Sequence, residues 1–496
     1  MKKVAIFCLC LLMPTFIIAK PVSEPTKAPV DIAKPQIFIS QHTGKFNGNK
    51  IHYTAIAGET LLKNKKGEVT ARIFSTSYIK DGTKDTSKRP VAFLYNGGPG
   101  SSSVWLHMGV FGPKRVAIPS DAKDDGAAPY PIVDNPYSLL DVADLVFIDP
   151  VGTGYSVVDG VGKNKDFWGV TEDAKSLAQF IRIWITQHKR WNSPKYFGGE
   201  SYGTTRSAAL INQLEGGYGD VSMQGIILIS SILDFTVRAY DEGNETPYMV
   251  YLPSMAATAQ YHKKAGQNLT VEQFTQQARE FAEGEYITAL LKGNRLSAKE
   301  HAHIRDRLAY FTGLSAQYID EANLRITYPR FEKELLRDQG LTVGRLDSRF
   351  TGKDFDNAGE YPDNDPSFYG IDGAYTSAIN NYLLNDLHVK INREYNIIGL
   401  DGKWNWDIKN GKRNPYLNVA PYIGKAMREN SQLRVFNAAG YYDFATPLMG
   451  AEYSLTRNGI DASRVTRKYY KSGHMVYIHH PSMVKLVTDI RQFIKH

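Results

Sequence analysis

Short apolar runs that each end in a glycine-rich loop recur along this chain and restrict its fold most. Residues 91–95 (VAFLY) run into NGGPG, and residues 145–148 (LVFI) run into DPVGTG. Further strand-like runs occupy residues 225–229, 433–437 and 465–470. Apolar runs of this length are typical of strands buried on both faces of a sheet.

Segments with helical periodicity alternate with these runs. Residues 171–188 carry apolar side chains at helical spacing, a second helix-like segment ends near residue 214, and a third covers residues 483–494. Strands and helices that alternate over about 90–240 and 415–496 predict an α/β fold. Its central sheet is expected to be mostly parallel and to carry helices on both faces.

Two other segments have a different pattern. Residues 36–80 alternate apolar and polar positions between glycines, which favours antiparallel hairpins. Residues 270–340 are polar, charged and helical in pattern, and residues 340–375 are rich in Gly, Asp and Pro. We therefore predict a core in two parts, residues 36–235 and 391–496, with a mainly helical cap inserted at 236–390.

The N-terminus has the layout of a secretory signal peptide over residues 1–19: two lysines, an apolar stretch and Ala19 before the cleavage point. Residues 20–35, rich in Pro, Lys and Ala, predict a linker. No later window reaches about 18 uninterrupted apolar residues, so no membrane span is expected in the mature chain. We expect an exported protein, periplasmic or secreted, or placed in a lysosome-like lumen in a eukaryote.

Cysteine content and charge exclude several classes of site. Both cysteines, Cys8 and Cys10, lie in the predicted signal peptide, so the mature chain is expected to hold no disulfide, thiol nucleophile or thiolate metal site. The 59 Lys and Arg exceed the 51 Asp and Glu only slightly and form no dense run, which disfavours nucleic acid as a partner. The adjacent His479 and His480 do not suit a shared ion. No metal and no cofactor are predicted.

Residues 199–203 (GESYG) fit the pattern G-x-S-x-G between a strand-like and a helix-like segment. Glycines at these positions leave room for a sharp strand-to-helix turn that presents a serine hydroxyl. Ser201 is therefore the predicted nucleophile.

A serine nucleophile needs a base, and the base needs an acid that orients it. Asp443 follows the run at 433–437, and His474 follows the run at 465–470, where the carboxyl ends of parallel strands gather functional loops. The chain order Ser201, Asp443, His474 is that of the α/β hydrolases. The glycine-rich loop after residues 91–95 predicts that the amides of Gly98 and Tyr202 form the oxyanion hole.

Four segments in order resemble the serine carboxypeptidase family. They are residues 96–103 (NGGPGSSS), 149–156 (DPVGTGYS), 199–202 (GESY) and 473–476 (GHMV), and we identify the chain as a bacterial-like member. The resemblance implies an α/β-hydrolase fold with a cap, and removal of C-terminal amino acids from peptides with a free C-terminus. It also implies that Asn96, Gly97 and Glu200 bind the terminal carboxylate of the substrate.

The chain departs from the family's pattern at three positions. Ser101 stands where the family has a cysteine, and Leu94 stands where it has a tryptophan. Val110 replaces an acid that in the family shares a proton with the residue at Glu200, so one influence that raises the pKa of Glu200 is missing. We therefore expect a free-acid peptide to bind best on the acidic side of neutrality, further from neutrality than in relatives with both acids. An esterase or acyltransferase with the same triad is the alternative function. An inactive scaffold is disfavoured because the triad is intact.

Overall fold

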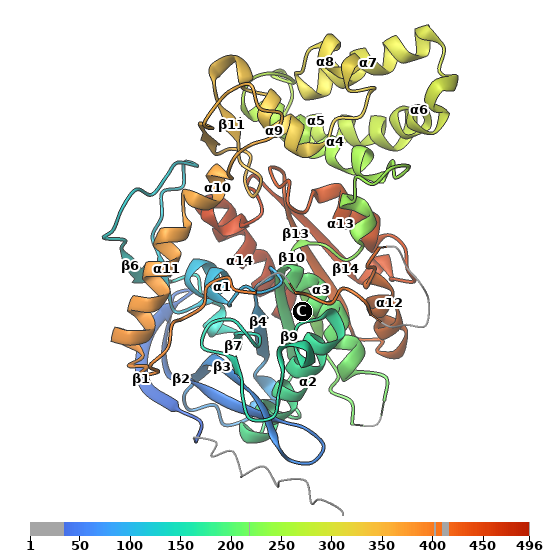
Figure 1. Ribbon diagram of the computed structural model, residues 1–496. Helices are drawn as coiled ribbons and strands as arrows, with labels where there is room; N and C mark the ends of the chain where they lie inside the picture. The colour runs from blue at the N-terminus through green and yellow to red at the C-terminus, as the bar shows by residue number, and fades with distance from the viewer. Residues whose placement is uncertain (1–33, 218, 401–402, 409–415, 496) are drawn as a thin grey trace, which may run out of the picture. The chain divides into compact units, whose positions relative to one another are not determined.

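The computed structural model describes residues 34–495 except 218, 401–402 and 409–415. The predicted signal peptide and all of the predicted linker except its last two residues lie outside the described residues. A ten-stranded sheet runs through the described part of the chain (Figure 1) in the order β1-β2-β3-β7-β4-β9-β10-β13-β14, with β8 paired to β3. The strands are β1 (Ile37–Phe46), β2 (Asn49–Lys63), β3 (Val69–Lys80), β4 (Val91–Tyr95), β7 (Asp144–Ile148), β8 (Val157–Val158), β9 (Lys195–Ser201), β10 (Gly225–Ser231), β13 (Arg434–Gly440) and β14 (Val465–Tyr470).

The expected mixture of parallel and antiparallel pairing is confirmed. Strands β1, β2 and β3 form antiparallel pairs, and β3 joins β7 in antiparallel register. From β7 to β14 all neighbouring strands are parallel. The loops after β9, β13 and β14 therefore leave the sheet at the same edge, which is where a parallel sheet collects its functional residues.

Helices cover both faces of the sheet, as predicted, because the apolar strands present side chains to both sides. Ala92 and Leu94 of β4 pack with α1, α11 and α14, whereas Phe93 and Tyr95 pack with α2, α3 and α12. Each large apolar side chain buried in this way stabilises the fold by about 1.5–3 kcal/mol. The helices are α1 (Val104–Leu106), α11 (Asp372–Asn381), α14 (His480–Lys495), α2 (Val170–Gln187), α3 (Tyr202–Leu214) and α12 (Ala420–Glu429).

Residues 246–369, between β10 and the helix α11, are mostly helical and have their own apolar core. Phe274, Phe311 and Phe331 belong to this core, which also takes in Phe444 from the loop after β13. The helical segment is therefore packed on the edge of the sheet where the loops emerge (Figure 1). Its helices are α4 (Thr246–Tyr261), α5 (Val271–Phe281), α6 (Ile287–Lys292), α7 (Ala298–Thr312), α8 (Ala316–Glu321), α9 (Tyr328–Glu334) and α10 (Pro366–Tyr369). The division of the chain at residues 235 and 390 stays a prediction.

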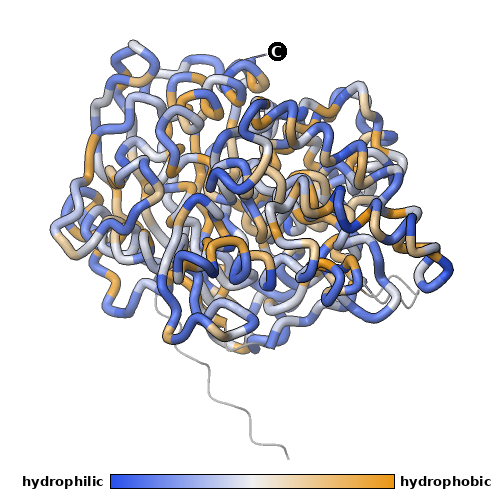
Figure 2. Tube along the Cα trace, turned by 90° about the horizontal axis from the view of Figure 1, so that it is seen from above, coloured by the Kyte–Doolittle hydropathy of each residue, from blue (hydrophilic) through white to orange (hydrophobic). Residues whose placement is uncertain are grey.

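Smaller elements complete the described chain. The short strands β5 (Lys114–Val116) and β6 (Ile132–Asp134) pair with each other, as do β11 (Thr342–Val343) and β12 (Thr351–Gly352). Helix α13 (Leu448–Leu455) follows the loop after β13. Apolar and polar residues alternate along the trace (Figure 2), and among the described helices none is long and apolar enough to cross a membrane.

Candidate active site

Ser201 lies at the sharp turn between β9 and α3. Its φ of 59° is in the left-handed region, which a residue with a side chain adopts at a cost of about 1–3 kcal/mol. A Cβ atom at Gly199 would lie 2.3 Å from the carbonyl oxygen of Gly203, and one at Gly203 would lie 3.0 Å from the carbonyl oxygen of Tyr95. The two glycines therefore allow the close approach that holds Ser201 in this conformation.

His474 and Asp443 form a buried hydrogen-bonded pair. Their Nδ1 and Oδ2 atoms are 2.8 Å apart. The other carboxylate oxygen of Asp443 accepts hydrogen bonds from the amides of Ala445, at 2.8 Å, and Thr446, at 2.9 Å. With its proton on Nδ1, the imidazole presents Nε2 as a base.

Sequence reasoning missed Thr446, whose side chain joins the same pair. Its hydroxyl donates to Oδ2 of Asp443 at 2.7 Å and lies 3.1 Å from Nδ1 of His474. A hydroxyl residue three positions after an acidic residue, where a loop meets a helix, is the signal that could have found it. Thr446 therefore restrains both members of the pair.

The main chain around His474 is held by the helical segment and by β10. The His474 amide donates to the carbonyl oxygen of Leu346 at 2.6 Å, and the Ser230 hydroxyl donates to the carbonyl oxygen of His474 at 2.5 Å. A Cβ atom at Gly473 would lie 2.4 Å from the Leu346 oxygen, so this close approach requires glycine. Residues far apart in the chain thus position the imidazole.

The pKa of His474 is set by opposing influences. Burial lowers it, but the charge of Asp443 and the hydrogen bond to it, together with the charge of Glu200, outweigh burial and raise the pKa above its usual value. The imidazolium is therefore stabilised, as a base that accepts a proton from a serine requires.

The two residues predicted to form the oxyanion hole, Gly98 and Tyr202, line the same cavity as Ser201. Tyr202 is the first residue of α3, so its amide has no partner inside the helix. Gly98 has a φ of 100°, which favours glycine, in the loop after β4. Between them lies Gly97, where a Cβ atom would be 2.5 Å from the amide nitrogen of Tyr202.

Replacing Gly97 by alanine is therefore expected to lower kcat/KM by roughly 10²–10³, because the new methyl group would displace an oxyanion donor. The measurement is steady-state kinetics on a peptide substrate, with thermal unfolding as a check on folding. Gly284→Ala is a control for the change of residue type, because nothing lies within 4 Å of a Cβ atom there and the backbone is helical. Near-normal turnover of the Gly97 variant would contradict this placement of the donors.

Glu200 is buried beside the nucleophile, and its hydrogen bonds within the described residues come from Tyr477 and Asn96 rather than from a second acid. The Tyr477 hydroxyl donates to its Oε2 at 2.7 Å, and Asn96 contributes a further hydrogen bond. Burial nevertheless raises the pKa of Glu200 to about 7. The charge of Asp443 acts in the same direction as burial. The expectation that a free-acid peptide binds best on the acidic side of neutrality stays a prediction.

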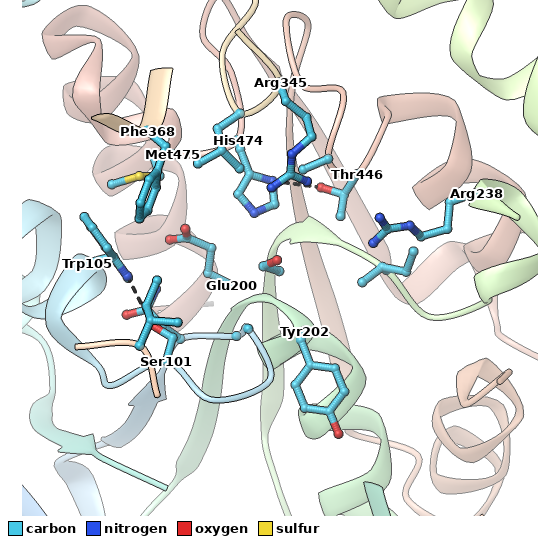
Figure 3. A pocket seen from close by; sticks show the side chains of 18 of the residues that line it. Ser101, Trp105, Glu200, Tyr202, Arg238, Arg345, Phe368, Thr446, His474 and Met475 are labelled. Carbon is cyan, nitrogen blue, oxygen red and sulfur yellow. Dashed lines mark hydrogen bonds between the residues drawn. The ribbon is translucent and has the colours of Figure 1, made fainter. Parts of the chain in front are cut away.

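One cavity of about 200 Å³ brings the predicted residues together (Figure 3). Asp443 lies behind His474, and the other seven predicted residues line the cavity wall. Among the described residues Ser201 and His474 share this wall without a hydrogen bond between them, which is common before substrate binds. Sequence reasoning did not single out the other lining residues, which include Trp105, Arg238, Arg345, Phe368 and Met475.

A family model described as serine carboxypeptidase matches residues 77–488 of this chain. The chain belongs to the serine carboxypeptidase family. The match spans β4, β9, β13 and β14 together with the helical segment, so it includes every part of the site described above.

Individual relatives agree with this membership. The chain is 30% identical over 161 residues to serine carboxypeptidase-like 13 of Arabidopsis thaliana, which is 32% of this chain and 36% of the relative. It is 27% identical over 195 residues to the pheromone-processing carboxypeptidase KEX1 of Ogataea parapolymorpha, or 38% of this chain and 30% of the relative. The chain thus spans about a third of the length of the curated relatives it matches.

A solved structure has the same fold over most of the chain. KEX1(delta)P, a prohormone-processing carboxypeptidase from Saccharomyces cerevisiae, superposes with a TM-score of 0.53 at 16% sequence identity. The superposition covers 89% of this chain and 91% of that one. The α/β-hydrolase fold predicted from the sequence is therefore confirmed.

Proposed function

We propose that this protein is an exported serine carboxypeptidase that removes the last amino acid of a peptide through an acyl-enzyme. The buried Glu200, next to the nucleophile in the cavity and with a pKa of about 7, carries this proposal. A carboxyl group that is protonated near neutrality donates a hydrogen bond to a substrate carboxylate instead of repelling it. Membership of the family supports the same assignment.

The residues of the cavity account for each step of peptide-bond cleavage. Ser201 Oγ attacks the carbonyl carbon of the last peptide bond and passes its proton to Nε2 of His474, which Asp443 orients. The amides of Gly98 and Tyr202 stabilise the oxyanion. His474 then protonates the leaving amine, the C–N bond breaks, and a water activated by His474 hydrolyses the acyl-Ser201 ester.

The terminal carboxylate of the substrate is assigned to the side of the cavity that holds Glu200. Asn96 and Gly97 line the same wall and complete the site, since Asn96 already bonds to Glu200. The bound carboxylate fixes which peptide bond lies at Ser201, so only the final residue is released.

The test of this function compares three matched substrates: a blocked dipeptide as the free acid, as its amide and as its ester. Release of the last amino acid from the free acid, with much weaker turnover of the amide, is the expected result. Ester turnover without peptide turnover would favour an esterase or acyltransferase instead. One observation favours this alternative: the residue at position 110 is the buried, apolar Val110, which cannot share a proton with Glu200.

The KM for the free-acid peptide is expected to rise with pH. Below about pH 7 the Glu200 carboxyl is protonated and donates to the substrate carboxylate, and above it the ionised group repels the substrate. The expected increase is roughly tenfold between pH 6 and pH 8, if chemistry is slow relative to substrate release. Glu200→Gln keeps a donor without a titrating proton, so its KM should stay nearly flat.

The matching amide is the control, because it has no carboxylate for Glu200 to repel. Its KM should not follow the same curve. Loss of turnover in acid is read separately from kcat, because His474 must be neutral to act as a base. A pH-independent KM for the free acid would show that Glu200 only supports the turn.

Further parts of the proposal rest on the sequence. Export rests on the signal-peptide pattern at residues 1–19, and the role of residues 236–390 as a cap over the cavity rests on their helical pattern between two halves of the core. The relatives above come from a plant and yeasts, so they give no support to a bacterial-like member of the family. Peptides with a free C-terminus are the proposed substrates.

A further inference from the structure

Two arginines enter the cavity from elements that the catalytic residues do not use. Arg238 ends the short turn η5 (Phe235–Arg238) after β10, and Arg345 lies in the helical segment just after β11. Figure 3 shows Arg238 and Glu200 on opposite sides of His474, with the Arg345 side chain directed toward His474. The two guanidinium groups therefore face the part of the cavity away from Glu200.

Neither guanidinium group forms a short ion pair within the described residues. Within the described residues the Arg238 side chain forms no hydrogen bond and no ion pair. Arg345 Nε is 4.0 Å from Asp365, whose carboxylate already accepts the amides of Arg345, at 3.0 Å, and Leu346, at 3.1 Å. Both arginines thus keep donors for an anion that is not part of the described chain.

The rest of the wall adds little negative charge. Of the cavity-lining residues that the structure describes, Glu200 is the only acid, and with a pKa of about 7 it is only partly ionised at neutrality. Two guanidinium groups, which stay charged at any working pH, therefore dominate the charge of this cavity.

The charges of both arginines act on one buried hydroxyl, that of Tyr251. The Tyr251 side chain of α4 is fully buried, and its oxygen has no hydrogen-bond partner among the described residues. Burial raises the pKa of Tyr251, while Arg238 and Arg345 both act to lower it, so the two arginines lie near this hydroxyl. Tyr251 itself does not line the cavity, so the two arginines are the donors that a bound anion would contact.

We propose that Arg238 and Arg345 bind an acidic side chain of the substrate, so that peptides with Glu or Asp immediately before the C-terminal residue are preferred. This inference rests on the proposed carboxypeptidase function. The terminal carboxylate is assigned to the wall with Glu200, so the residue on the other side of the scissile bond lies toward the opposite wall. The arginines on that wall recognise a carboxylate through charge-assisted hydrogen bonds.

The test uses two N-blocked dipeptides, Glu-Phe and Gln-Phe, which have nearly the same shape and differ by one charge. The wild-type protein is expected to favour Glu-Phe by about tenfold in kcat/KM, as one charge-assisted contact supplies. Added salt should reduce this ratio, because it screens the attraction. Arg238→Gln and Arg345→Gln should each bring the ratio toward one, and Arg238→Lys should restore part of it.

The matched control is Arg457→Gln, which removes the same charge from an exposed arginine that packs on Tyr453 outside the cavity. Its Glu-to-Gln ratio should equal that of the wild type. Equal hydrolysis of the two peptides by the wild type would overturn the inference, while release of Phe from either would still support the carboxypeptidase function. No release from either peptide would overturn both.

The same variants also show whether the arginines bind the side-chain carboxylate or the terminal carboxylate of the substrate. If Arg238→Gln changes the discrimination between free acid and amide but leaves the Glu-to-Gln ratio unchanged, the arginines bind the terminal carboxylate. That result would overturn the preference for an acidic side chain.

Discussion

Replacing Ser201 by alanine is expected to lower kcat/KM by roughly 10⁴–10⁶, because the acyl-enzyme cannot form without the hydroxyl. The residual rate would come from the oxyanion donors and from substrate binding, which the substitution leaves in place. The fold should be retained, since alanine removes only one oxygen and the glycines that permit the turn remain.

Two measurements check this result. Steady-state kinetics on the free-acid peptide gives the loss of kcat/KM, and a serine-directed phosphonate probe should label the wild type but not Ser201→Ala. Ser463→Ala, at an exposed serine of the η10 turn (Ala462–Arg464), is the matched control and should keep both activity and labelling. Labelling at another serine, or near-full activity without Ser201, would rule out the assignment.

Replacing Asp443 by asparagine is expected to lower turnover by roughly 10⁴. One carboxylate oxygen accepts two backbone amides, and the other accepts Nδ1–H of His474. An amide in this position would keep its oxygen on the backbone donors and turn its NH₂ group toward Nδ1. The imidazole would then carry its proton on Nε2, where Ser201 needs a base.

The KM of the same peptide should change little, because Asp443 does not line the cavity. The pKa of His474 should fall, since the charge of Asp443 no longer raises it. A pH profile of kcat therefore distinguishes this loss from simple unfolding. Asp461→Asn, at an exposed acid that caps η10, should be normal in both respects. Near-normal turnover of Asp443→Asn would mean that another acid orients His474.

The elements found from the sequence are those whose signals are local. Strand β14 (Val465–Tyr470) has the bounds that its strand-like run predicts, and β4 coincides with residues 91–95. Helix α14 begins at His480 rather than 483, because Pro481 fits the first turn of a helix and the apolar periodicity starts only after it. Boundaries of this kind depend on backbone geometry that periodicity does not record.

The residues of the site also fall into those with a local sequence signal and those without one. The glycines around Ser201 and the position of His474 after a strand are local patterns, so their residues could be named in advance. Thr446 was missed because its role depends on the hydrogen bonds it shares with Asp443 and His474 in the folded chain. Arg238 and Arg345 come from segments more than 100 residues apart, and no local pattern relates either to the cavity.

The sequence by itself determined the family, the parallel sheet and the three residues that form the proposed triad, because each depends on residue types at short spacing. The tertiary structure decided what surrounds them. It brings the pKa of Glu200 to about 7, chiefly through burial. It also directs two arginines into the cavity: Arg345, whose ion pair with Asp365 is long at 4.0 Å, and Arg238, which forms no ion pair within the described residues. Desolvation and charge are set by all the groups that pack around a side chain, and those groups are assembled only when distant segments fold together.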